Sequence, residues 1–248
     1  MNDLARLLCL LPLLTGCDAG GAGGDAGPPA RSPTDGGDLA TGDASDGDGS
    51  PDSGAAEAAT ALVAGPDGPL RIDRYEAARP DASLQHQGTA TGAARSRLGV
   101  LPWSGVTLPE AEAACAQAGA RLCTCAELLA ACQGAGGRAF PYGTSFAAGR
   151  CNDYHGSAPV QPTGSSAGCQ TPEGVADLVG NLAELCRGPD RETAVAAGGS
   201  CRLTALAVSL KLDRCAAQEQ QLPADLRRED VGFRCCDQIG RASCRERV

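Results

Sequence analysis

The segment Ala111–Gly134, AEAACAQAGARLCTCAELLAACQG, decides how this 248-residue chain folds, because it combines helix signals with four cysteines. Thr107-Leu-Pro-Glu110 before it and Thr124-Cys-Ala-Glu127 within it have the spacing of capping boxes. We predict one helix that starts after Thr107 and stops at Gly119, and a second that runs from Thr124 to Gly134. The segments elsewhere are short and broken by Gly and Pro, which favours an irregular α+β domain over a doubly wound sheet.

The chain holds 14 cysteines, which a reducing cytosol does not favour unless they bind metal. We therefore expect an oxidising compartment. Cys123 and Cys125, with Cys132 nearby, could also form a zinc cluster, but Cys₄ zinc sites usually come as paired CxxC knuckles. Disulfides are the favoured interpretation.

The negative charge lies mainly in one segment. The whole chain carries −9, and residues 18–67 alone account for −9, because nine Asp and Glu57 stand there against Arg31. Residues 69–238 contain 16 basic and 18 acidic side chains, a net charge of −2. The acidic balance of the chain argues against nucleic acid as the partner, because phosphate binding needs a basic face.

The N-terminus predicts export and lipid anchoring. Residues 7–14 form an apolar run that is too short to span a membrane but suits a signal peptide over residues 1–16. The run ends in Leu14-Thr15-Gly16-Cys17, which resembles a bacterial lipobox, with Cys17 as the lipidated residue. The alternative is an ordinary cleaved signal with an incidental cysteine. With lipidation, the partner is the inner or outer membrane of a bacterial cell envelope.

The remaining boundaries follow from composition. Residues 17–68 are acidic and rich in Gly and Asp, so they are predicted to be a disordered tether. Residues 69–238 form the domain. Residues 239–248 can be back-translated, with permitted codons, to a string that resembles a sequencing adapter, and we exclude them and Cys244 as an artefact.

Eight blocks of the domain resemble, in order, the formylglycine-generating enzyme or sulfatase-modifying factor family. They are Ile72–Glu76, Leu101–Thr107, Ala111–Gly134, Phe140–Gly143, Cys151–Asn152, Gly174–Glu184, Gly198–Ser200 and Gly232–Cys235. The resemblance implies an irregular variant of the C-type-lectin-like fold with little regular secondary structure, stapled here by disulfides.

The resemblance also implies a reaction, which this sequence does not support. The family's oxidase binds copper through two cysteines three and eight places after the GGS motif, and here those places hold Leu203 and Val208. The loop from Ser200 offers only Cys201, a weak catalytic candidate, and Cys215. We therefore expect a non-catalytic binding or structural module without copper. The alternative is a divergent oxidoreductase, or another enzyme, of the family.

An iron site is not expected either. A related branch of the family binds iron mainly through histidines, whereas this chain has only His86 and His155, which are not paired at a short spacing. The ligand of a binding module, a protein or a saccharide, cannot be identified from the sequence.

Two disulfides carry over from the family, Cys115–Cys235 and Cys132–Cys215. The remaining domain cysteines are one too many to form pairs, and the family comparison makes Cys125 the odd one out. Their pairing stays open: Cys123, Cys125, Cys151, Cys169, Cys186, Cys201 and Cys236.

A structural calcium site is also implied by the resemblance. Its ligands would be the carboxylate of Asp177 and the backbone carbonyls of Leu178, Gly180 and Leu182, which are hard oxygen ligands that suit Ca²⁺. The alternative is a Gly-Asn turn capped by Asp177. Asn152 matches a second calcium site of the family, but no acidic partner for it is evident.

Overall fold

The structure is a computed structural model that describes residues 59–153, 159–187 and 194–239. The predicted signal peptide, the lipidation of Cys17 and most of the predicted tether lie outside the described residues, as does His155. Of the ten C-terminal residues, only Ile239 is described.

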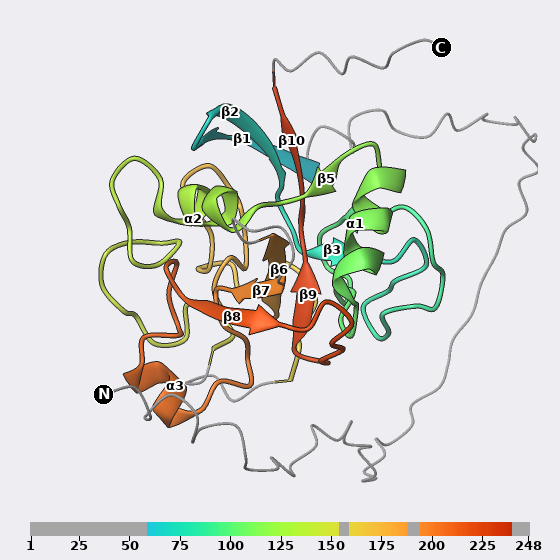
Figure 1. Cartoon of the computed structure of the whole chain (residues 1–248). Helices are drawn as coiled ribbons and strands as arrows, with labels where there is room; N and C mark the ends of the chain where they lie inside the picture. Colours follow the sequence, from blue (N-terminus) through green and yellow to red (C-terminus); the bar gives the residue numbers. More distant parts are fainter. Residues whose placement is uncertain (1–58, 154–158, 188–193, 240–248) are drawn as a thin grey trace, which may run out of the picture. The chain divides into compact units, whose positions relative to one another are not determined.

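The first sheet brings the two ends of the domain together (Figure 1). Its order is β1 (Thr60–Gly65), β2 (Gly68–Asp73), β10 (Cys235–Gln238) and β5 (Arg121–Leu122), and all neighbours are antiparallel. The C-terminal strand therefore lies between a strand from the start of the domain and one from the segment between the helices.

The predicted tether, which was expected to continue to residue 68, ends earlier, because residues 60–65 form strand β1. Thr60–Gly65 pairs with β2 and buries Ala61 and Val63 on its inner side. The hairpin turn between them contains Pro66-Asp67-Gly68, a strong turn sequence, and the alternation of β1 is the period of a half-buried strand. The small side chains of this strand concealed it within the Gly- and Ala-rich composition.

The second sheet has the order β8 (Gln218–Leu222), β7 (Ala194–Ala197), β6 (Ala183–Arg187) and β9 (Val231–Phe233). The β6–β9 pair is parallel and the other two pairs are antiparallel. A two-stranded ribbon of β3 (Ala77–Ala78) and β4 (Arg95–Ser96) completes the sheets.

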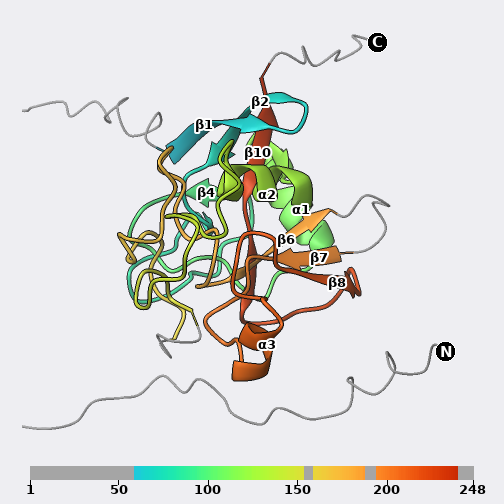
Figure 2. The same cartoon turned by 90° about the vertical axis from the view of Figure 1, so that its left-hand side faces the viewer.

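Both predicted helices are confirmed. Helix α1 covers Leu108–Gln117 and helix α2 covers Cys125–Gln133, and each starts at a complete capping box made by the predicted Thr–Glu pair. The third helix, α3 (Ala205–Ser209), is capped by Thr204 and buries none of its residues. Figures 1 and 2 show α3 set apart from α1 and α2.

The domain has two hydrophobic clusters. One packs α2 against the inner face of β1 and β2, and the other packs α1 against β6 and β9 around Trp103 and Phe233, whose rings meet edge to face at 5.6 Å. The mixture of short helices, short strands and long connections confirms the predicted irregular α+β class. No helix among the described residues is long and apolar enough to cross a membrane.

Five disulfides connect these elements. They are Cys115–Cys235, Cys123–Cys236, Cys125–Cys186, Cys132–Cys215 and Cys151–Cys169. The first and fourth are the two bridges that the family resemblance implies.

The expectation that Cys125 is the odd cysteine is wrong. Thr124 forms a parallel bridge with Arg187, which brings Cys125, at the start of α2, next to Cys186 in β6. Among the eleven described cysteines, the one that takes part in none of these five disulfides is Cys201, which is buried.

Candidate functional site

The loop that would carry copper in the family follows β7 directly. Gly198 and Gly199 have φ values of 81° and 72°, and a Cβ atom on them would lie 2.4 Å from the carbonyl oxygen of Leu178 and 2.3 Å from that of Leu212. Only glycine fits this turn. The next residue, Ser200, is buried and donates a hydrogen bond of 2.9 Å to Asp230. The loop therefore leaves the sheet in a fixed direction.

The two copper positions of the family hold hydrocarbon side chains. Leu203 is half-buried just before α3, and Val208 is half-buried within α3. The two cysteines of the loop lie elsewhere: Cys215 is bonded to Cys132, and Cys201 is buried, with its backbone N–H 3.0 Å from the carbonyl oxygen of Asn181. The arrangement places no thiol at either copper position.

Instead, the loop presents an apolar surface. Leu206 is 58% exposed and Leu210 is 62% exposed, on and just after α3. These side chains cannot coordinate a metal ion.

A buried polar cluster lies beneath this loop and links both sheets. Glu76 accepts hydrogen bonds from the Asn181 side chain at 2.6 Å and from the Leu182 N–H at 3.0 Å. Arg234, which is completely buried, donates to Glu184 at 2.7 Å. It also donates to the backbone carbonyls of Asp73 and Ala176, so its guanidinium connects β2 with β6.

The carboxyl groups of this cluster are strongly perturbed. Burial raises the pKa of Glu76 well above its usual value, and the neighbouring Asp177 raises it further. Burial also raises the pKa of Asp177, to about 6. The cause is that one guanidinium must balance several carboxylates in an interior that disfavours net charge.

The predicted calcium loop is part of this cluster. Asp177 and Asn181 have left-handed backbone conformations, with φ values of 58° and 53°, and Gly180 between them has a φ of 79°. The Asp177 carboxylate is buried and accepts a hydrogen bond of 2.6 Å from the Gly164 N–H. The Asp177 carboxylate is a hard oxygen donor of the kind that Ca²⁺ prefers.

Asn152 lies against the same loop. It is buried, and its side-chain amide donates to Asn181 at 3.0 Å and to the Pro159 carbonyl at 2.9 Å. Its Oδ1 atom accepts no hydrogen bond within the described part of the chain. A buried oxygen of this kind suits the second cation position that the sequence suggested.

Across the same described residues, no three His, Cys, Asp or Glu side chains come close enough together to hold a metal ion.

His86 is exposed, and its backbone N–H donates to Ser83.

Sequence reasoning missed Glu76 and Arg234 as members of a shared site. Both belong to blocks that carry the family resemblance, but Glu76 lies more than 100 residues before Asn181, so only the fold brings them together.

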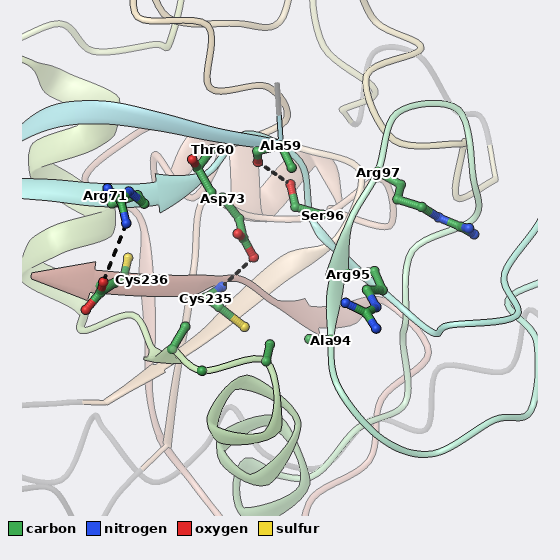
Figure 3. A pocket seen from close by; sticks show the side chains of 14 residues that line it. Ala59, Thr60, Arg71, Asp73, Ala94, Arg95, Ser96, Arg97, Cys235 and Cys236 are labelled. Atoms are coloured by element: carbon green, nitrogen blue, oxygen red, sulfur yellow. Dashed lines mark hydrogen bonds and ion pairs between the residues drawn. The ribbon is translucent and has the colours of Figure 1, made fainter. Parts of the chain in front are cut away.

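A separate cavity of about 570 Å³ opens between β2, β10, β4 and the end of α1 (Figure 3). Its polar lining includes Arg71, Asp73 and Arg95, and its other walls are made largely of small side chains. Sequence reasoning gave no signal for this cavity, because its walls come from four distant segments.

The model of the family described as sulfatase-modifying factor enzyme 1-like domain matches residues 68–239. Among solved structures, Treponema denticola variable protein 1 is 14% identical, covers 68% of this chain and 84% of its own, and has a TM-score of 0.49. CarF is 17% identical, with coverage of 69% and 87% and a TM-score of 0.42. The I1 variant of the major tropism determinant is 14% identical, with coverage of 72% and 52% and a TM-score of 0.44. A search of curated protein sequences finds no match.

Proposed function

This chain belongs to the sulfatase-modifying factor enzyme 1-like family and has its variant C-type-lectin-like fold, and from this premise we propose that it is a non-catalytic binding or structural module of a bacterial cell envelope. Family membership alone does not give the activity, because function depends on the site rather than on the fold.

One observation carries the proposal: Leu203 and Val208 occupy the two positions at which the family's oxidase holds copper. Cu(I) binds soft sulfur ligands, and neither side chain offers an electron pair. Ten of the eleven described cysteines are joined in disulfides. Sulfur in this domain thus serves mainly to cross-link the chain.

The location is part of the same proposal. Five disulfides suit an oxidising compartment outside the cytosol. We propose that the signal peptide directs export, that Cys17 carries the lipid, and that the acidic segment lets the domain reach away from the membrane. Metabolic labelling with a palmitate analogue tests the anchor: the wild-type chain becomes labelled, and Cys17→Ala does not.

Oxygen uptake tests the absence of oxidase chemistry. The purified protein is supplied with copper, a reductant and a cysteine-containing peptide, and oxygen consumption and peptide mass are followed. We expect no aldehyde product and no oxygen uptake above that of Cys201→Ala. Formation of formylglycine by the wild-type protein, lost in Cys201→Ala, would establish the alternative of a divergent oxidase.

We also propose that Ca²⁺ binds at the Asp177 loop as a structural ion, held by the Asp177 carboxylate and the carbonyls of Leu178, Gly180 and Leu182. The cation would compensate the buried negative charge that Asp177 shares with Glu76. Its contribution is to stability and not to a reaction.

Thermal unfolding tests the ion. At a Ca²⁺ concentration of about 100 times Kd, ligand binding stabilises by about 2.7 kcal/mol, which raises the Tm by about 5–10 °C. Asp177→Asn should remove this response, whereas the exposed Asp225→Asn should retain it. A Tm that Ca²⁺ does not change would support the alternative of a turn capped by Asp177.

A further inference from the structure

The floor of the cavity in Figure 3 is one face of the first sheet, because successive side chains of a strand point to opposite faces. On β2, Leu70 and Ile72 point into the core, so Arg71 and Asp73 lie on the opposite face of the sheet. On β10, Asp237 is paired in register with Arg71, and their charged groups are 3.9 Å apart. This face of the first sheet therefore carries charged groups where the other face carries the core.

The walls consist largely of small residues. Ala94 and Ser96 lie in one wall at β4, on either side of Arg95, and the segment after α1, Ala118-Gly119-Ala120, forms another. Because most of these side chains are short, a volume of about 570 Å³ stays open. Cavities of about 300–1,000 Å³ are the usual size for small-molecule sites.

Two opposite charges line this space without neutralising each other. The Asp73 carboxylate accepts one hydrogen bond, of 3.3 Å, from the Cys235 N–H. The Arg95 side chain makes no hydrogen bond or ion pair with any residue in the described ranges, so it forms no ion pair with Asp73 there. Arg97, by contrast, donates to the Ala82 carbonyl, and Figure 3 shows its guanidinium turned away from the cavity.

We infer that this cavity binds a free amino acid, with the ligand carboxylate at Arg95 and the ligand ammonium at Asp73. A guanidinium offers parallel N–H donors that match a carboxylate. An ammonium is suited to a carboxylate, and it is also favoured by the negative end of the α1 dipole, which lies at the wall around Ala118. The small residues leave room for the side chain of the ligand.

This inference deepens the proposed binding function, but its failure is distinguishable from failure of that function. The cavity lies between the first sheet and β4, whereas oxidase chemistry concerns the loop after β7. Oxygen uptake tests the loop, and amino-acid binding tests only the cavity.

Saturation-transfer NMR on the purified full chain, near neutral pH, tests the inference with a mixture of the twenty protein amino acids. At least one should bind, and its affinity is then measured by calorimetry. Asp73→Asn and Arg95→Gln should each weaken that affinity about tenfold or more, the effect of losing a charge-assisted contact. The matched exposed variants Asp225→Asn and Arg150→Gln should leave it unchanged.

Two further experiments test the inference even if Asp73→Asn or Arg95→Gln does not fold. Ala118 is exposed at the cavity wall, so Ala118→Trp should block binding without altering either charged group. The N-acetyl and amide derivatives of the bound amino acid should bind at least about tenfold more weakly. No binding from the mixture, or binding that survives acetylation or Ala118→Trp, would overturn the inference.

The pH dependence gives an independent readout. Burial raises the pKa of Asp73 to about 6, so affinity should rise as the pH increases from about 5 to about 7 and the carboxylate forms. Asp73→Asn should remove this rise, and a wild-type affinity that does not change over this range would contradict the assigned role of Asp73. The other charged groups around Asp73 are Arg234 and Glu184 beneath the sheet, Arg71 and Asp237 on it, and Arg95 and Arg97 on the β4 side.

Discussion

The segment Ala111–Gly134 and the loop Ser200–Cys215 both contain cysteines, but they use them differently. Each of the four cysteines of the first segment is bonded to a partner 61 to 120 residues further along the chain. The loop holds the far end of one such bridge and the buried Cys201, and it exposes leucines on and after α3. The difference teaches that the disulfide framework of this fold and the proposed loss of its catalytic site are separate features, which can be tested separately.

The largest expected effect comes from the two bridges that hold β10, Cys115–Cys235 and Cys123–Cys236. Either one keeps the long loop closed when the other is removed, so all four cysteines must be changed to Ser. By chain entropy, this should cost about 6 kcal/mol of unfolding free energy, whereas removing Cys151–Cys169, with a separation of 18, should cost about 3 kcal/mol. Urea unfolding of the two variants measures the difference, and equal losses would contradict the entropic role of the two long bridges.

The second largest loss of stability is expected from breaking the buried ion pair between Arg234 and Glu184. Arg234→Met leaves Glu184 and its neighbouring carboxylates without their guanidinium, and breaking a buried pair in this way should cost about 4 kcal/mol. Arg227, which pairs with Glu110 at the surface, provides the matched control: Arg227→Met should leave the unfolding free energy almost unchanged. Similar losses for the two variants in urea unfolding would show that the cluster is not an essential part of the scaffold.

A third effect is the change in unfolding free energy as the Asp73 carboxyl group titrates. The pKa of Asp73 is raised from 3.8 to about 6, so the folded state binds this proton more tightly than the unfolded state. The stability that this group contributes is therefore complete below about pH 4 and is lost as the pH rises through about 6, by about 3 kcal/mol. Unfolding measured across this range should show a smaller decline in Asp73→Asn than in the wild type; parallel curves would contradict the assignment.

The smallest effect is expected in the loop. Leu206→Ser combined with Leu210→Ser changes side chains that are 58% and 62% exposed, so the loss of stability should stay within about 0.5 kcal/mol. Leu70→Ala, in the core beneath β2, should cost about 2–5 kcal/mol by comparison. A large loss in the exposed pair would mean that α3 belongs to the framework after all.

The sequence predicted those parts of the fold that depend on local signals or on ordered motifs. The threonines and glutamates of the capping boxes placed α1 and α2, and the ordered blocks indicated the family. Strand β1 escaped prediction because its burial depends on β2 and α2, which local composition does not reveal. The Cys125–Cys186 bridge escaped because it depends on where β6 lies relative to α2.

The candidate sites divide in the same way. The prediction that Leu203 and Val208 stand at the copper positions of the family could be made from the sequence, since it requires only a spacing from the GGS motif. The Glu76–Asn181 contact and the cavity at Asp73 are not visible, because they join residues from distant segments. Their chemistry appears only when the fold brings opposite or like charges close together.

The most direct measurement of the central claim is a Cu(I) titration against a competing chelator, made on the wild-type protein and on Leu203→Cys combined with Val208→Cys. The account predicts that the wild type takes up no stoichiometric copper, and that the double variant, with thiols at the two family positions, gains about one Cu(I) per chain. Tight, stoichiometric copper binding by the wild-type protein would contradict it.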